Sequence, residues 1–100
     1  MDEDERNVRV TVVHAPACHF CDDAERALST LAGRFRLEVR TVDVDSAEGR
    51  HLLAVHRPAL NPLVLVDGVF FSAGRLPRRK LEKLLAARAA GRTAPAAVGK

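Results

Sequence analysis

Residues 8–21 read VRVTVVHAPACHFC and contain the only two cysteines of this 100-residue chain, Cys18 and Cys21. The first seven of these residues are rich in valine and mostly alternate between apolar and polar side chains, which is typical of a strand. Pro16 ends the run, because the residue before a proline avoids helical geometry and a proline suits the approach to a helix. An amphipathic helical pattern begins near Cys18. The sequence therefore predicts a strand, a short turn and a helix whose first turn holds both cysteines.

The position of the two cysteines favours redox chemistry. A thiol in the first turn of a helix meets unpaired backbone N–H groups and the positive end of the helix dipole, and both favour the thiolate. Cys18 is therefore the candidate nucleophile. Cys21 lies on the same helix face within bridging reach, so it can displace a partner that is bound to Cys18. We expect the pair to form a reversible, redox-active disulfide.

The two residues between the cysteines have alternative interpretations. A protonated His19 would stabilise the Cys18 thiolate, whereas a neutral His19 would be an exposed polar spacer. Phe20 falls on the apolar stripe of the helix, so we expect it in the core or in the wall of a substrate groove.

Length and composition fit one domain in a reducing compartment. The chain is 47% apolar with a net charge of +3, which suits a single compact core. Two closely spaced cysteines cannot cross-link distant segments, and a secreted disulfide scaffold of this size usually has more. The first six residues, MDEDER, lack the pattern of a secretory signal. No apolar run approaches the roughly 20 residues of a membrane span. We expect a soluble cytoplasmic protein without membrane association.

The rest of the chain alternates between helical and strand patterns. We expect a helix over about 18–34, which Gly33 ends, and then a strand over 37–44. An Asp45/Glu48 capping box would start a short helix, which Gly49 weakens. A strand over 63–66, an Asp67-Gly68 hairpin turn, a strand over 69–72 and a helix over 77–90 would follow. Residues 1–91 would form the domain, and residues 92–100 a disordered tail. The order β-α-β-α-β-β-α predicts an α/β fold with a four-stranded mixed sheet and helices on both faces.

These features together resemble the glutaredoxin-like proteins of the thioredoxin-fold superfamily. The resemblance spans about residues 8–90. It rests on a dithiol straight after the first strand, a proline before a short apolar strand, the Asp-Gly hairpin, a glycine after the last strand and a closing helix. It implies a thioredoxin-like fold with the sheet order second, first, third and fourth strand. The dithiol comes too early for the additional N-terminal strand and helix of thioredoxins, so the smaller glutaredoxin-like version fits better.

The resemblance also implies a substrate site beside the Cys18-His19-Phe20-Cys21 motif. Its expected substrate-binding residues are His19, Phe20, Asn61, Pro62, Gly74 and Arg75. Pro62 would be the cis-proline that faces the dithiol, with Pro58 as the competing position. The backbone of Asn61 would pair with an extended substrate segment. Arg75 could bind a substrate carboxylate or be a solvated surface charge.

The resemblance implies thiol–disulfide exchange without a required organic cofactor. The expected partners are a disulfide-containing protein or a small thiol, and glutathione or another low-molecular-weight thiol could serve. In this chain Ala15 stands where glutaredoxins usually have a basic residue, and residues 72–75 read Ser-Ala-Gly-Arg instead of paired glycines followed by an acid. We expect a monomer.

Two other functions remain open at this point. His14, Cys18 and Cys21, with His19 or His51, could supply zinc ligands, but one CxxC pair is half a zinc site, so we expect no metal. The second function is that of a non-catalytic binding module. Its basic last helix could contact nucleic acid, but no aromatic residues interleave with its charges, so we do not expect that partner either. The preferred prediction is a thiol–disulfide oxidoreductase in which Cys18 attacks and Cys21 resolves.

Overall fold

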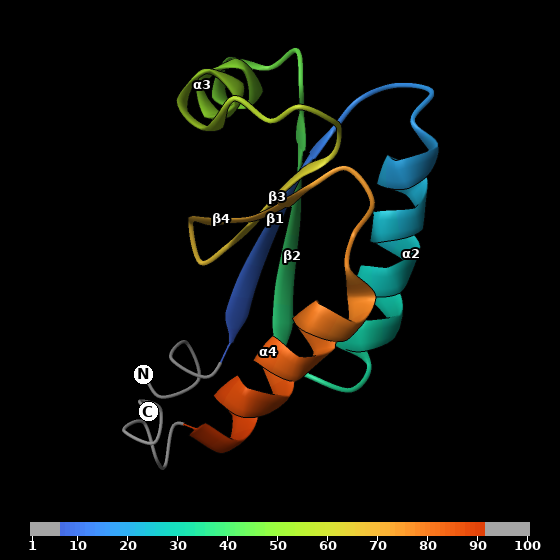
Figure 1. The fold of residues 1–100 in the computed structure, drawn as a ribbon, viewed down its shortest axis with the longest axis vertical. Coiled ribbons are helices and arrows are strands. Elements are labelled where there is room, and N and C mark those ends of the chain that lie inside the picture. The colour runs from blue at the N-terminus through green and yellow to red at the C-terminus, as the bar shows by residue number, and fades with distance from the viewer. Residues whose placement is uncertain (1–6, 92–100) are drawn as a thin grey trace.

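The computed structural model describes residues 7–91 (Figure 1). Its elements are β1 (Val8–His14), α2 (His19–Ala32), β2 (Leu37–Asp43), α3 (Ala47–His56), β3 (Leu63–Val66), β4 (Val69–Ala73) and α4 (Arg78–Gly91). The predicted order β-α-β-α-β-β-α is confirmed. Gly91 closes α4 instead of following it, and the tail predicted over 92–100 lies outside the described residues.

The four strands form one mixed sheet in the order β2-β1-β3-β4. β1 and β2 are parallel, with Val8 opposite Leu37, and a right-handed crossover through α2 is expected for such a pair. β3 is antiparallel to both β1 and β4. This is the strand order that the resemblance implies.

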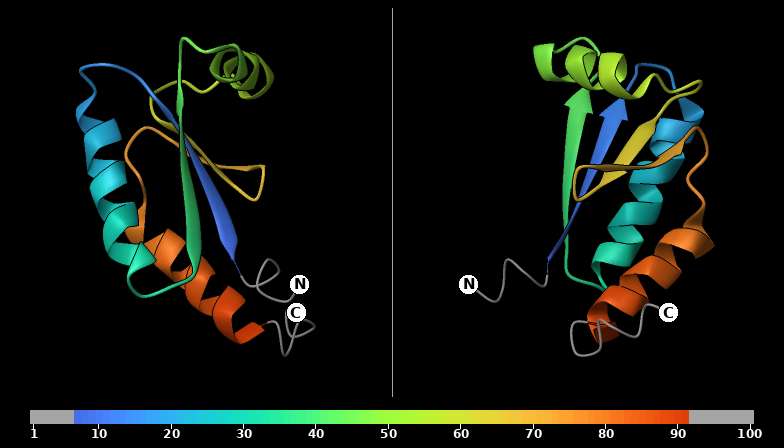
Figure 2. Two further views of the ribbon diagram at one scale, coloured as in Figure 1. Left: turned by 180° about the vertical axis from the view of Figure 1, so that it is seen from behind. Right: turned by 60° about the vertical axis from the view of Figure 1, so that its left-hand side comes forward.

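Helices cover both faces of the sheet, as the sequence predicts. α2 and α4 lie together over one face (Figure 1). α3 lies on the other face, near the end at which β1 and β2 terminate (Figure 2). In the described part of the chain, the second face is therefore covered over only part of its length.

The larger core lies between the sheet and the two helices α2 and α4. Its buried residues are Val8, Val10, Val12, Ala24, Ala27, Leu28, Leu31, Val64, Val66, Leu76, Leu81 and Leu85. Alternation along β1 turns every second valine towards this face, and three- and four-residue steps along α2 turn one helix stripe towards the same core. The predicted inward residues Leu81 and Leu85 of α4 are fully buried here.

The smaller core lies under α3. Val13, Leu63 and Leu65 are buried in it, and the half-buried Leu52 and Leu53 of α3 pack against them. Gly49 brings this helix close to the sheet, because a Cβ atom at this position would lie 2.0 Å from the carbonyl oxygen of Asp43. The sequence treats Gly49 only as a weak point of the helix, whereas the structure gives it a packing role.

The predicted start of α3 is wrong by one residue. Ser46, and not Asp45, caps the helix: its Oγ accepts a hydrogen bond from the backbone N–H of Gly49 at 2.9 Å. The carboxylate of Glu48 does not close a capping box. It accepts two hydrogen bonds from the guanidinium of Arg40 on β2, at 2.8 and 2.5 Å. These hydrogen bonds lower the pKa of Glu48 and raise that of Arg40.

The Asp67-Gly68 hairpin forms as predicted. Both residues have positive φ, 52° and 83°, as a type I′ turn requires. β4 contains an irregularity that the sequence does not reveal. Leu65 lies opposite Phe70 and Val64 lies opposite Ser72, so Phe71 has no partner in β3. Phe71 packs against the larger core instead.

Candidate active site

Cys18 is positioned by the turn that joins β1 to α2. Ala17 has a positive φ of 51°, and Cys18 then has the extended backbone of a helix N-cap, with φ −118° and ψ 108°. Its Sγ accepts a hydrogen bond from the backbone N–H of Cys21 at 3.1 Å. The helix therefore begins at His19, one residue later than predicted, and the sulfur of Cys18 is the acceptor for a first-turn N–H group that has no partner within the helix backbone.

The two cysteines are joined in a disulfide, and they differ in exposure. Their Cα atoms are 5.2 Å apart, within the usual range for a disulfide. Cys21 is fully buried, whereas Cys18 is half-buried. An incoming sulfur can therefore approach Cys18 from solvent, while only Cys18 can reach Cys21. This asymmetry suits one attacking and one resolving thiol.

Phe20 forms one wall beside the dithiol. Its side chain is 39% exposed, so it lies on the surface and not in the core, and His19 is exposed beside it. The guanidinium carbon of Arg75 lies 5.8 Å from the centroid of the Phe20 ring, within cation–π range. The structure thus joins two residues that are 55 positions apart and that the sequence assigns separately to the substrate site.

The Asn61–Pro62 peptide bond is cis, which identifies Pro62 and not Pro58 as the cis-proline. Pro62 is buried, whereas Asn61 is exposed. The carbonyl oxygen of Pro62 accepts a hydrogen bond from the backbone N–H of Gly74 at 3.0 Å. Gly74 has a φ of 91°, and a Cβ atom there would lie 3.1–3.2 Å from side-chain atoms of Leu60. Glycine is therefore required at this position.

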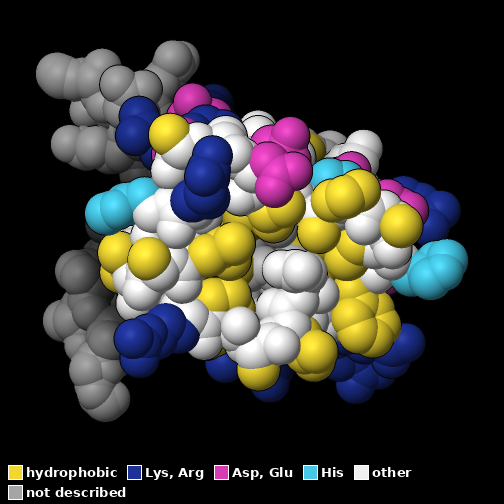
Figure 3. Space-filling model, turned by 90° about the horizontal axis from the view of Figure 1, so that it is seen from above, with side chains coloured by type: hydrophobic (Ala, Val, Ile, Leu, Met, Phe, Trp, Pro, Cys, Tyr) yellow, Lys and Arg dark blue, Asp and Glu magenta, His cyan; other side chains and the backbone are white. Residues whose placement is uncertain are grey.

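These contacts link the predicted substrate residues into one rim. Gly74 holds the Pro62 loop, its neighbour Arg75 contacts Phe20, and Phe20 follows Cys18 by two residues. Figure 3 views the end of the molecule at which α2 begins. Hydrophobic side chains are gathered there around a central region of polar side chains and backbone. Leu60, which packs at Gly74 and is 58% exposed, is an apolar residue of the rim that was not predicted.

Two side-chain contacts near the start of α2 were also not predicted. Nδ1 of His14, at the end of β1, lies 2.8 Å from Oε2 of Glu25 on α2. Arg78, at the start of α4, pairs with Asp23 in the first turns of α2. The pairing partners are 11 and 55 residues apart, so no local sequence pattern indicates them.

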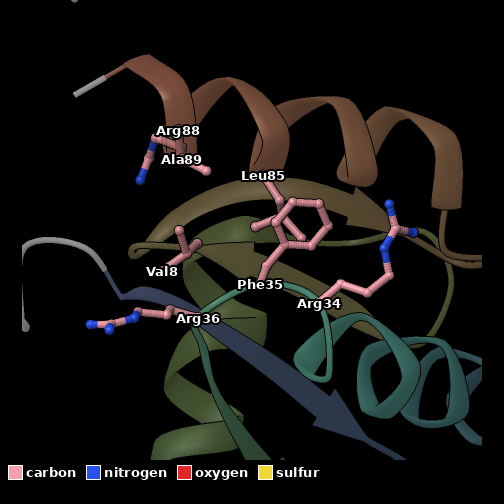
Figure 4. Close-up of a pocket in the computed structure, with 7 residues that line it drawn as sticks. All are labelled: Val8, Arg34, Phe35, Arg36, Leu85, Arg88 and Ala89. Carbon is pink, nitrogen blue, oxygen red and sulfur yellow. The ribbon is translucent and has the colours of Figure 1, made fainter. Parts of the chain in front are cut away.

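Within residues 7–91, no group of three or more His, Cys, Asp or Glu side chains could hold a metal ion. A pocket of about 270 Å³ lies at the far end of α2, and Val8, Phe35 and Leu85 are among its lining residues (Figure 4). None of the predicted site residues lines it. No helix within the described range has the length and apolar character needed to cross a bilayer.

Comparison with known proteins identifies the fold. No protein-family model matches the chain, and no curated protein matches it either. A chloroplastic thioredoxin z structure is 21% identical, with a TM-score of 0.67, and covers 88% of this chain and 83% of its own. A mutant thioredoxin from Halobacterium salinarum is 24% identical, with a TM-score of 0.61, and covers 88% of this chain and 80% of its own. Oxidised mitochondrial thioredoxin 3 from Saccharomyces cerevisiae is 22% identical, with a TM-score of 0.60, and covers 82% of this chain and 80% of its own.

Identities of 21–24% with TM-scores of 0.60–0.67 establish the fold alone. The chain has the thioredoxin fold, as the sequence resemblance implies. The glutaredoxin-like subtype stays a prediction, because all three of these neighbours are thioredoxins.

Proposed function

We propose that this chain is a thiol–disulfide oxidoreductase of glutaredoxin-like type that works through Cys18 and Cys21. One observation carries the proposal: a disulfide in the first turn of α2 joins a half-buried sulfur to a fully buried one. A structural disulfide would gain most by closing a long loop, and this one joins residues only three positions apart. Its placement suits reversible opening better than cross-linking.

The reaction has two exchange steps. In the first, the Cys18 thiolate attacks one sulfur of a partner disulfide, a bond forms between Cys18 and that sulfur, and the other partner sulfur leaves as a thiolate that takes up a proton. In the second, the Cys21 thiol loses its proton and attacks Cys18 Sγ. The mixed disulfide breaks and the partner leaves with its second thiol. Two electrons pass from the dithiol to the partner, and the reverse sequence oxidises a partner dithiol.

The rim beside Cys18 would hold the partner during these steps. Asn61 is exposed immediately before the cis bond, so its backbone can pair with an extended segment as an added strand. Phe20 and Leu60 offer exposed apolar surface to that segment, and Arg75 offers a guanidinium for a carboxylate. His19 lies exposed next to the attacking sulfur.

The partner in this proposal is a protein disulfide or a low-molecular-weight thiol such as glutathione. The dithiol itself carries both electrons, so the reaction requires no organic cofactor. A reducing, cytoplasmic setting would return the pair to its active dithiol form. We propose that the chain acts as a monomer.

A mixed-disulfide trap tests the assigned roles. Cys21→Ser keeps the attacking thiol but removes the resolving one, so this variant should accumulate covalent complexes with protein disulfides. Cys18→Ser is the matched control, because it differs from wild type by the same atom at the other position. It should form few complexes, since its remaining thiol is buried.

Two results would contradict the proposal. Equal yields of trapped complexes from the two variants would remove the distinction between attacking and resolving cysteine. The pair would be a metal site if wild-type protein purified without chelator contained stoichiometric zinc and if either cysteine variant lacked that zinc.

A further inference from the structure

Positive charge gathers on one side of the dithiol. Arg75, Arg78, Arg79 and Lys80 line one surface hollow of about 640 Å³, whose only acidic lining residue is Asp23. In Figure 3, Lys and Arg side chains lie along the lower edge of this end of the molecule, and no Asp or Glu is visible in that half of the view.

Three of these cations are available to a partner. Arg78 is occupied by its ion pair with Asp23. Arg75, Arg79 and Lys80 have no ion pair with any residue in the range 7–91, although Arg75 and Lys80 lie over the rings of Phe20 and Phe71. We define Arg75, Arg79 and Lys80 as the basic rim.

The backbone that carries the basic rim is anchored on both sides. Leu76 and Leu81 are buried in the larger core, at exposures of 2% and 0%. The Arg78–Asp23 pair ties the start of α4 to α2. The backbone of the basic rim is thus fixed, and binding a partner would require little ordering of it.

We propose that the protein partner of this site has an acidic segment next to its reactive cysteine, which docks on the basic rim. This inference rests on the proposed function and specifies its substrate class. Charge complementarity supports it: the rim presents three cations without acidic partners in the described chain, and Arg75 links them directly to Phe20 beside Cys18.

A polypeptide suits this surface better than a small anion does. The lining residues Arg75, Arg78, Arg79 and Lys80 are exposed, so the hollow is shallow. A small ligand would keep most of its surface in water there, whereas binding pockets usually enclose theirs. A protein segment can contact the apolar Phe20 and Leu60 and the basic rim at the same time.

Two model peptides give a direct test. Each contains one cysteine in a disulfide with 2-mercaptoethanol; one has three glutamates beside the cysteine, and the other has three glutamines. The Cys21→Ser protein attacks the peptide sulfur through Cys18, the bond to mercaptoethanol breaks, and mercaptoethanol leaves as a thiolate that takes up a proton. No net oxidation occurs, and mass spectrometry measures the rate of mixed-disulfide formation.

The glutamate peptide should react about tenfold faster at low ionic strength, because complementary charge raises association rates. The advantage should fall below about threefold in about 0.5 M NaCl, where charges are screened beyond about 4 Å. Arg79→Glu, in the same Cys21→Ser background, should reduce the ratio of the two rates at least threefold. Arg36→Glu is the matched control, since it changes net charge equally but lies beyond the opposite end of α2, and it should keep the ratio.

Three results would overturn the inference while leaving the exchange reaction intact. These are equal rates for the two peptides at low salt, an equal loss of preference in Arg36→Glu and Arg79→Glu, and strong inhibition by a single-stranded oligonucleotide, which would make the rim a nucleic-acid site. Failure of both peptides to react would instead overturn the proposed function itself, and the inference with it.

Discussion

The two faces of the sheet bury very different numbers of residues. Twelve buried residues pack between the sheet and the helices α2 and α4, whereas three are buried under α3. The dithiol belongs to the first face, because Cys21 is buried at the start of α2. The loop with the cis bond follows α3 on the second face. The attacking sulfur is therefore attached to the strongly packed side, and the proposed substrate platform to the weakly packed side.

Because of this difference, we expect substitutions on the two faces to have different effects. A change in the larger core should lower global stability, since burial of apolar surface is the main favourable contribution to folding. A change under α3 should cost less stability and should first affect how a substrate docks. Four substitutions test this comparison.

Leu28→Ala should have the largest effect on stability. Leu28 is fully buried between α2 and the sheet, so its truncation leaves a cavity in the larger core. We expect the free energy of unfolding to fall by about 3–5 kcal/mol, which is a large part of the total for a small domain. Urea denaturation measures it, and a loss below about 1 kcal/mol would mean that this core does not dominate stability.

Gly49→Ala should have the second-largest effect, and its sign is diagnostic. Helix propensity alone predicts a gain of about 1 kcal/mol. The added methyl group would overlap the carbonyl of Asp43, so we expect a loss of about 1–3 kcal/mol instead.

The loss from Gly49→Ala should also be local. Mixed-disulfide formation with the peptides should slow, because α3 leads into the Pro62 loop, while alkylation of Cys18 by iodoacetamide should keep its rate. Ala54→Gly is the control, since it lowers helix propensity at an exposed position of the same helix without a clash. Stabilisation by Gly49→Ala would show that α3 does not pack closely on β2.

Leu53→Ala is the counterpart of Leu28→Ala on the second face. Leu53 is half-buried and packs against the smaller core. A partly exposed leucine loses less on truncation, so we expect a cost of about 1–2 kcal/mol. If the two leucine variants unfold at the same urea concentration, the proposed inequality between the faces is wrong.

Glu48→Gln should have the smallest effect, and it should depend on pH. The hydrogen bonds from Arg40 lower the pKa of Glu48 in the folded protein, so the stabilisation is present above the ordinary pKa of glutamate. It is lost as the pH falls through the lowered value. Both groups are exposed, so we expect a small difference in Tm between parent and variant at neutral pH and none in acid. A difference that persists in acid would point to another cause.

Local sequence patterns account for the elements, and they fail where distant segments meet. Valine alternation, helical periodicity and Asp67-Gly68 predict every strand and helix, and β3 has the predicted bounds. Ser46 and Asp45 are both good helix caps, so the sequence could not choose between them. The role of Gly49 depends on the carbonyl of Asp43, which only folding brings near.

The residues of the candidate site also fall into two groups: those that the sequence indicates and those that depend on contacts between distant segments. The cysteine pair and the proline before β3 could be found from the sequence and the resemblance, and the cis bond is at the predicted residue. Leu60 could not be found, because its place in the rim comes from packing against Gly74, 14 residues later. The Arg78–Asp23 pair, which engages the acidic residue beside the basic rim, spans 55 residues. Contacts between segments far apart in the sequence set both features.

The unpaired Phe71 has a consequence for solubility. The described sheet has two edges, and β2 protects its own with the charged side chains Glu38 and Arg40, which discourage a neighbouring molecule from adding a strand. β4 reads VFFSA and has no charge to do this. Its bulge interrupts the regular spacing of backbone donors and acceptors instead, so the uncharged edge is a poor template for aggregation between copies of the chain.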